Sequence, residues 1–398
     1  MVINYFIHPL YYIHCIFMRN IFWFLLLLFT ACSREVRKSP LTELSVPSLS
    51  STSSLRMSSF ATSVQCVPLA ADDSVVIDEL MRVIVAKNFI YAADNGTLYK
   101  FTLEGKLVSS ICRRGNSPSE YINVSDFQVD DAGNVWVLSR NNKALYHYVW
   151  DGSLGKKITL DNWVEKICLL GKGKMLLYAG NEKNKDYKYT LYTLDLETGT
   201  VINESLLIDD YKSAYLHVKS LNHFSTDGEQ RLFYQMFNDT VYSLSDKGEA
   251  TPEYILNLGG RNIPASFYEH KYRDIMDFFQ NLFKESYAYG TALFIHSDAS
   301  CLFSLFYNRN SYWCIRRGDE TFIGNRLTDD MCLSGYELDL SEISCFVQPD
   351  NQLVVVLSPY LVMESAKKSL SKEQQKNLAE MMQYNGEEQN PVLLKIQI

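Results

Sequence analysis

The run Val135–Leu138 (VWVL) precedes Leu145–Tyr148 (LYHY) and then the turn pair Asp151-Gly152. An earlier stretch follows the same plan, with Ile90–Asp94 (IYAAD) before Leu98–Phe101 (LYKF). Short runs rich in aliphatic and aromatic residues, separated by polar turn residues, are typical of antiparallel β-strands. The recurrence of the pair indicates that one sheet unit is repeated along the chain.

Six copies of this unit can be found, and their first runs begin at residues 90, 135, 175, 232, 302 and 353. A four-stranded propeller blade needs about 40 to 50 residues, close to most of these intervals. We therefore predict an all-β fold, a six-bladed β-propeller over residues 61–398. The run Ser63–Leu69 has no other partner, so we expect this N-terminal strand to pair with the C-terminal blade and close the ring.

The two inserted segments at about 266–286 and 371–385 are predicted to be helical. Ser266 and Glu269 form a capping-box pattern, and apolar residues follow at helical spacing. Ser371 and Gln374 repeat the capping pattern in the last blade.

Residues 1–32 have the features of an export signal. Met18, the predicted true start, is followed by Arg19 and by the nine apolar residues 21–29, too few to span a bilayer. The run Phe29–Cys32 (FTAC) resembles a bacterial lipobox, which makes Cys32 the predicted lipidation site and the lipid anchor to a membrane. The alternative is an ordinary secretory signal with an incidental cysteine. We expect a lipoprotein of the cell envelope, in the outer membrane, with its periplasmic or surface side left open.

The serine-rich segment 33–60 is predicted to be an unfolded tether, because it has few large apolar residues to bury. The net charge of -8 and the pI near 5.5 give no basic field, which excludes nucleic acid as a partner. The cysteines show neither CxxC nor Cys/His spacing, so no metal and no cofactor are expected. We interpret these cysteines as small buried hydrophobic residues, with a disulfide framework as the alternative.

Three stretches resemble one family, the six-bladed β-propeller lipoproteins of Bacteroidota, which is defined only as a domain of unknown function. They are Arg113–Tyr121 (RRGNSPSEY), Asn238–Tyr242 (NDTVY) and Asn390–Leu393 (NPVL). The family motif is usually richer in glycine, so Ser117 and Ser119 are departures from it. The resemblance implies the propeller fold, an envelope location and often a gene neighbourhood of glycan-uptake proteins, and it implies no established reaction.

The loop that carries the first motif is the candidate ligand-binding or structural loop. Arg113 and Arg114 could grip an anionic ligand or simply be solvated. Glu120 and Tyr121 could reach the central channel, or they could hold the loop and pack between blades.

No set of catalytic residues can be recognised, since the stretch Gly115–Ser119 lacks the final glycine of a nucleophile elbow. The leading hypothesis is a non-catalytic binding or scaffolding lipoprotein with a glycan, peptide or envelope protein as partner. One alternative is a hydrolase or lyase with its active site in the propeller channel. Another is a sensor that contacts a partner through the inserted helices.

Overall fold

The computed structural model describes residues 41–46, 49, 53–70, 75–183, 187–213, 218, 220–297, 300–332, 335–386 and 389–398. The predicted signal, Met18 and Cys32 lie outside the described residues. By its internal contacts the chain divides into two units, Met1–Leu41 and Thr42–Ile398. The following description concerns the second unit.

Strands of this unit form seven sheets, which we call blades. Blade 1 is β4 (Arg82–Ala86), β5 (Phe89–Ala93), β6 (Thr97–Thr102) and β7 (Leu107–Cys112). Blade 2 is β8 (Asp126–Val129), β9 (Val135–Ser139), β10 (Ala144–Tyr148) and β11 (Leu154–Thr159). Blade 3 is β12 (Lys166–Gly171), β13 (Lys174–Tyr178), β14 (Tyr189–Asp195) and β15 (Val201–Leu207).

Blades 4 and 5 follow, together with two blades that use strands from both ends of the unit. Blade 4 is β16 (Phe224–Asp227), β17 (Gln230–Phe233), β18 (Thr240–Leu244) and β19 (Ala250–Asn257), extended by β1 (Thr42–Ser45). Blade 5 is β20 (Ala288–His296), β21 (Ser300–Tyr307), β22 (Asn310–Arg317) and β23 (Glu320–Gly324). The small blade is β24 (Arg326–Asp329), β25 (Tyr336–Asp339) and β2 (Ser54–Arg56). The closing blade is β26 (Ser344–Val347), β27 (Gln352–Leu357), β28 (Val392–Gln397) and β3 (Ser63–Pro68).

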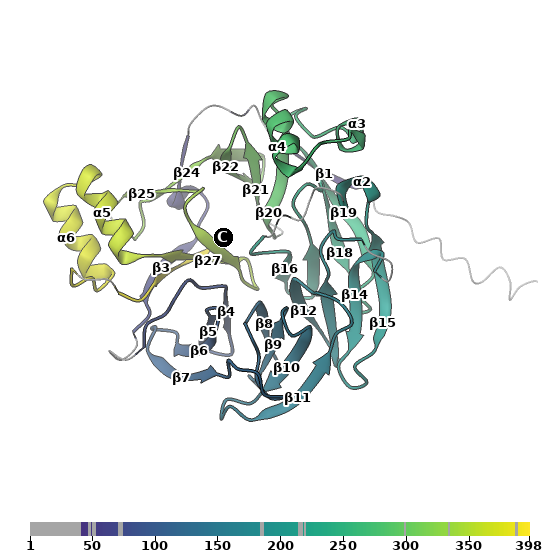
Figure 1. Cartoon of the computed structure of the whole chain (residues 1–398). Coiled ribbons are helices and arrows are strands. Elements are labelled where there is room, and N and C mark those ends of the chain that lie inside the picture. Colours follow the sequence, from purple (N-terminus) through teal and green to yellow (C-terminus); the bar gives the residue numbers. More distant parts are fainter. Residues whose placement is uncertain are drawn as a thin grey trace, which may run out of the picture. The chain divides into compact units, whose positions relative to one another are not determined.

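The first strands of several blades contact one another. β4 contacts both β8 and β26, β8 contacts β12, and β20 contacts both β16 and β26. Figure 1 shows the blades arranged in a ring, with β4, β8, β12 and β16 among the innermost strands. Each repeated pair of the sequence supplies the second and third strands of a blade, such as β9 and β10 in blade 2.

The predicted number of six blades is wrong, because the structure has seven. The missing one is the small blade, whose strands β24 and β25 have four residues each. Strands this short carry no pair of apolar runs, and the third strand comes from the distant N-terminal segment. The sequence repeat therefore does not reveal the small blade, which lies in the interval between the repeats that begin at 302 and 353.

The second half of the predicted tether differs from the expectation. Residues 33–40 lie outside the described residues, but β1 pairs in parallel with β19, and β2 pairs in parallel with β24. Leu44, Leu55 and Phe60 are buried. A composition argument misses these strands because a few well-placed apolar side chains are enough for a segment that adds to an existing sheet edge.

The closure by the N-terminal strand is confirmed. β3 pairs antiparallel with β28, from Ser63 opposite Gln397 to Pro68 opposite Val392. Gly105, in the β6–β7 turn, lies against the last residue of β3. Its φ is +89°, and a Cβ there would stand 2.0 Å from the Pro68 carbonyl oxygen, so only glycine fits.

Hydrophobic residues fill the spaces between neighbouring blades. Between blades 1 and 2, Tyr91 and Leu98 pack in one cluster with Phe127, Tyr146 and Tyr148. The strand β9 is buried along its whole length, because its alternate side chains face two different neighbouring blades.

Helices lie in the two predicted insertions, with different bounds. The first insertion holds α3 (Ala265–Glu269) and α4 (Ile275–Lys284), and α4 is capped by Asp274, which accepts the Asp277 N–H at 2.9 Å. Ser266 caps nothing, because α3 begins one residue before it. A further short helix, α2 (Asp210–Ser213), was not predicted.

The second insertion holds α5 (Pro359–Ser369) and α6 (Lys372–Met381). The predicted capping box of Ser371 and Gln374 is present at the start of α6, and α6 ends before residue 385. α5 was missed, although Ser358 followed by Pro359 at the first helical position is a recognisable start signal.

Candidate functional site

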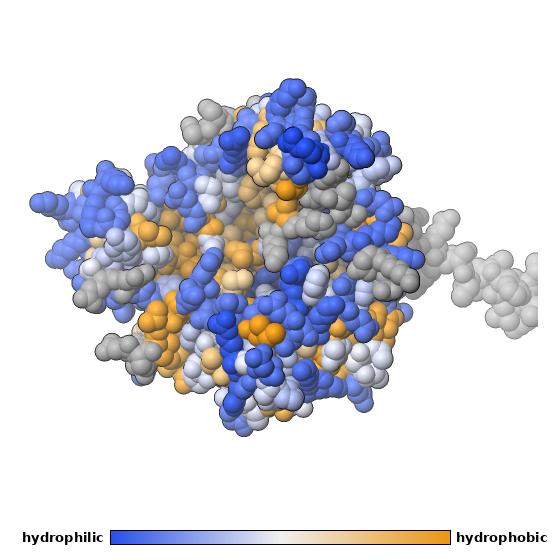
Figure 2. All heavy atoms as spheres, viewed as in Figure 1, coloured by the Kyte–Doolittle hydropathy of each residue, from blue (hydrophilic) through white to orange (hydrophobic). Residues whose placement is uncertain are grey.

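A cavity of about 580 Å³ lies where blades 2 and 3 meet. Its walls come from the segment before β8, the β9–β10 turn, the loop between β11 and β12, the end of β13 with the residues that follow it, and the segment before β16. Met81, before β4, and Asn95, in the β5–β6 turn, add a contribution from blade 1. Figure 2 shows mostly hydrophilic side chains over this part of the ring. Polar side chains therefore surround the cavity, while its lining combines polar and apolar surface.

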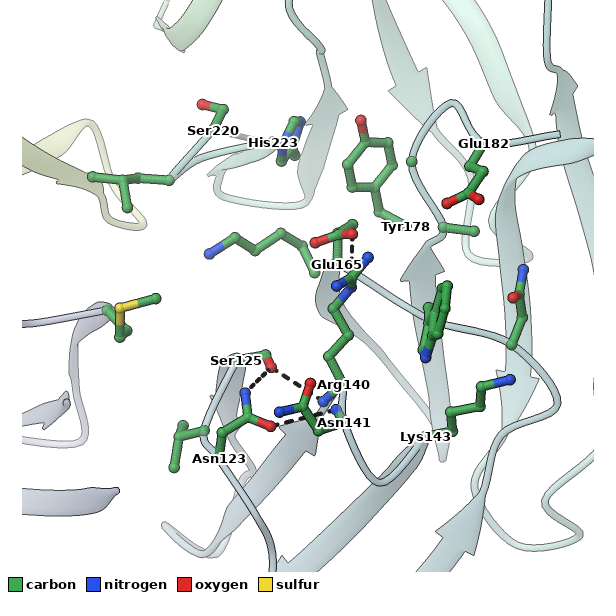
Figure 3. A pocket seen from close by; sticks show the side chains of 18 of the residues that line it. Asn123, Ser125, Arg140, Asn141, Lys143, Glu165, Tyr178, Glu182, Ser220 and His223 are labelled. Carbon is green, nitrogen blue, oxygen red and sulfur yellow. Dashed lines mark hydrogen bonds and ion pairs between the residues drawn. The ribbon is translucent and has the colours of Figure 1, made fainter. Parts of the chain in front are cut away.

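A hydrogen-bond network fixes the wall on the side of blade 2. The Asn123 side-chain amide donates to Ser125 Oγ at 2.7 Å, and Ser125 Oγ accepts the Arg140 N–H at 3.1 Å. The Ser139 hydroxyl donates to Asn142 Oδ1 at 2.6 Å. These bonds tie the segment before β8 to the β9–β10 turn (Figure 3), so the wall is held in shape without a ligand.

Trp163 stands at the cavity with two cations near its ring. Its side chain is 45% exposed, which is unusual for tryptophan. Arg140 Cζ and Lys143 Nζ each lie 5.2 Å from a Trp163 ring centroid, within the range of cation–π attraction. Arg140 Nε also lies 2.8 Å from Glu165 Oε1, an ion pair that joins blade 2 to the start of blade 3.

His223 and Tyr178 form the opposite wall, as Figure 3 shows. Their rings are 4.2 Å apart, and His223 Nδ1 lies 3.1 Å from the Tyr234 carbonyl oxygen. Burial lowers the pKa of His223 to about 3, and burial raises the pKa of Tyr178. Both side chains are therefore neutral at physiological pH, and Nδ1 of His223 is the nitrogen that donates its hydrogen to the carbonyl.

Amide side chains are the commonest polar groups of the cavity. Five asparagines line it, namely Asn95, Asn123, Asn141, Asn162 and Asn181. An amide offers both donors and acceptors without charge, so such a lining suits a ligand with many hydroxyl or amide groups. The lining fits recognition, since its histidine is neutral and Glu165 is paired.

None of the four residues of the predicted loop lines this cavity. Arg113, Arg114, Glu120 and Tyr121 all lie between β7 and β8. Arg113 Nε donates to the Gly152 carbonyl at 3.1 Å, and Arg114 is exposed. Glu120 Oε2 accepts the Ser117 N–H at 2.9 Å, and this bond lowers the pKa of the Glu120 carboxyl.

Tyr121 packs between blades, which was one of the two interpretations drawn from the sequence. It is fully buried, and its ring contacts Tyr146 and Tyr148 edge-on. Its hydroxyl donates to the Gly96 carbonyl at 2.9 Å. The contacts of this loop are structural, whereas a role for it in ligand binding stays a prediction.

Sequence reasoning missed Trp163, Arg140 and the asparagines of the cavity. A signal was available for Trp163, because Asp161-Asn162-Trp163 lies between two strand-like runs, where a tryptophan has no sheet face to pack on. The structure also buries His223 beside the cavity, which no local sequence pattern indicates.

Two further findings concern membrane-spanning helices and metal sites in the described residues. Among these residues no helix is long and apolar enough to cross a membrane. Within the same part of the chain, no three His, Cys, Asp or Glu side chains are grouped as metal ligands. Cys32 lies outside the described residues, so its lipidation stays a prediction.

The chain matches the family described as Domain of unknown function (DUF4934) over residues 42–397. The chain belongs to this family. The match begins at the first residue of β1, so the family domain includes the strands β1 and β2 that were expected to be tether. No curated protein matches the chain.

The chain is similar to solved structures from Bacteroides and Staphylococcus aureus. A Bacteroides fragilis protein named "Putative exported protein" is 16% identical, with a TM-score of 0.68 over 90% of this chain and 99% of its own. A member of the DUF4221 family from Bacteroides vulgatus is 9% identical, with a TM-score of 0.46 over 84% and 96%. Virginiamycin B lyase from Staphylococcus aureus is 11% identical, with a TM-score of 0.38 over 74% and 85%.

Proposed function

We propose that this chain is a non-catalytic, glycan-binding lipoprotein of the bacterial cell envelope, and that the cavity between blades 2 and 3 is its binding site. The observation that carries the proposal is the lining of that cavity, with five asparagines and an exposed tryptophan on a wall fixed by hydrogen bonds. Polar groups held in place before binding lose little entropy when a ligand arrives.

Sugars combine the two properties that this lining complements. Their hydroxyl groups donate and accept hydrogen bonds, as amides do, and their rings present apolar C–H faces that pack on an indole. Arg140 and Lys143, beside Trp163, add donors for hydroxyl or carboxylate oxygens. A peptide or an envelope protein remains the alternative partner and becomes an outcome of the binding test.

Catalysis has less support from the same side chains. A general acid must carry a proton at the working pH, but the pKa of His223 is lowered to about 3 by burial. Glu165 is already engaged in an ion pair with Arg140. Glu182 also lines the cavity, so a hydrolase or lyase at this site would have to rely on that carboxyl group.

A glycan array probed with the full-length chain tests the binding proposal. We expect selective binding of one glycan class, and Trp163→Ala should weaken that binding about tenfold or more, because it removes the exposed ring. Acidic and neutral versions of the bound glycan show whether Arg140 and Lys143 select a carboxylate.

Tyr360→Ala is the matched control, since Tyr360 is also 45% exposed and does not line the cavity. It should bind as the parent does. An array without binding above background, or equal affinity for the parent and Trp163→Ala, would rule the proposal out. Capture of peptides in place of glycans would assign the cavity to the alternative partner.

The envelope location and lipid anchor rest on the pattern around Cys32 and on the name of the Bacteroides fragilis structure. Two acyl chains anchor a protein stably, because each buried methylene contributes about 0.8 kcal/mol. Labelled palmitate should enter the parent protein and not Cys32→Ala. Equal labelling of the two proteins would show that Cys32 is not the acylated residue.

A further inference from the structure

Three sulfur-bearing side chains meet outside the cavity, each from a different part of the fold. Cys66 lies on β3, Cys332 follows β24, and Met381 is the last residue of α6. Cys332 Sγ stands 3.1 Å from Met381 Sδ, and Cys66 Sγ stands 3.9 Å from the Met381 carbonyl oxygen. The Cys66 and Cys332 side chains also hydrogen-bond to each other.

Apolar core residues lie on one side of these sulfur atoms, and the buried carboxyl group of Asp329 lies close to both thiols. All three side chains pack against the core cluster that joins the small blade to the closing blade. Each of the three residues is partly exposed, so an ion can reach them. The hydrogen bond between the two thiols lowers the pKa of Cys332 and raises the pKa of Cys66.

We propose that Cys66, Cys332 and Met381 form a site for a soft monovalent metal ion, Cu(I) in biology. Two thiolates and a thioether are ligands that select Cu(I) over hard cations. Binding would displace the thiol protons, so affinity should rise with pH. The participation of Met381 favours a metal site over a Cys66–Cys332 disulfide, because a disulfide has no use for a thioether.

A bound ion would connect the closing strand β3, the small blade and α6. These elements are far apart in the sequence and otherwise meet through apolar contacts. Because the unfolded chain does not hold the three ligands together, binding should stabilise the folded protein.

Competition between the reduced full-length chain and the Cu(I) chelator bicinchoninate tests the site. We expect one Cu(I) per chain, and a loss of affinity of about tenfold or more in Cys66→Ser, Cys332→Ser and Met381→Leu. X-ray absorption of the Cu(I) complex should show sulfur ligands alone. Ag(I), a redox-stable soft ion, should raise the Tm of the parent and raise it less in Met381→Leu, which keeps the test valid if a cysteine variant folds poorly.

Two matched variants control for other sulfur atoms. Cys112→Ser removes an exposed free cysteine, and Met276→Leu removes a methionine that is 63% exposed. Both should retain the parent affinity. Equal Cu(I) affinity for the parent and the Cys66→Ser, Cys332→Ser double variant would overturn the proposal. A Cys66–Cys332 disulfide in protein isolated from the envelope fraction, seen as a linked peptide pair by mass spectrometry, would overturn it as well.

Discussion

Buried His223 couples the stability of the protein to pH. Burial holds its pKa near 3, whereas an unfolded histidine titrates near 6.5. Between these values only the unfolded state binds the proton, so the free energy of unfolding should fall as the pH falls from about 6.5 toward 3. The contribution of one proton is about 1.4 kcal/mol per pH unit. Urea unfolding at several pH values should show a shallower pH dependence for His223→Asn than for the parent.

The comparison with His223→Asn separates this histidine from the carboxyl groups that titrate in the same range. His270→Asn, at an exposed position, should keep the slope of the parent. Identical slopes for the parent and His223→Asn would contradict the depressed pKa.

Individual residues show how far sequence reasoning reaches. The motif around Arg113 and Tyr121 identified a well-ordered loop, and one of the two interpretations of Tyr121 matched its place between blades. The cavity residues escaped notice because they come from seven separate segments. Asn123, Trp163 and His223 come together only in the folded ring. Their spacing in the sequence therefore does not indicate that they share a cavity.

Single elements were predictable where their signals are local. The capping box at Ser371 located the start of α6, and the repeated pairs located the second and third strands of the full-size blades. β1 and β2 were not predictable from composition, because their stability comes from the parallel pairing with β19 and β24.

Gly324 controls whether β2 can join the small blade. A Cβ at this position would lie 2.6 Å from the Ser53 carbonyl oxygen and 2.8 Å from Leu55 Cγ. Gly324→Ala should therefore push the segment around β2 away, at a cost of about 1 to 3 kcal/mol. Hydrogen exchange should become faster in residues 53–61 and stay unchanged in blade 1.

Gly96→Ala is the matched control, since its Cβ would meet no atom closer than 3.5 Å. We expect parent-like exchange in residues 53–61 for this variant. Unchanged exchange there in Gly324→Ala would show that the approach of β2 to Gly324 is looser than the structure has it.

At the scale of the molecule, the repeat predicted the ring and its closure but gave the wrong blade number. The sequence repeat identifies only units that contain two apolar runs. The small blade has two short strands, and its third strand comes from the N-terminal segment. The two ends were assigned correctly because a sheet edge left without a partner is a strong physical constraint.

Removal of β28 should disrupt the whole ring, not only its last blade. Val392, Leu393, Leu394 and Ile396 are all at most 1% exposed, and β28 is hydrogen-bonded on both sides, to β27 and β3. A chain that ends at Pro391 should lose its cooperative thermal transition, measured by circular dichroism. A chain that lacks Ile398 alone should keep it. A native-like transition in the longer truncation would mean that the ring is stable while open.

The first three strands of the folded unit, β1, β2 and β3, pair with strands that come much later in the sequence. Thr42 pairs with Tyr254, Ser54 with Arg326, and Pro68 with Val392, near the C-terminal end. These pairings cannot form until ribosomes have completed most of the chain. Because synthesis starts at the N-terminus, this leading segment emerges before its partner strands exist. The topology itself postpones closure of the ring until synthesis has reached β28.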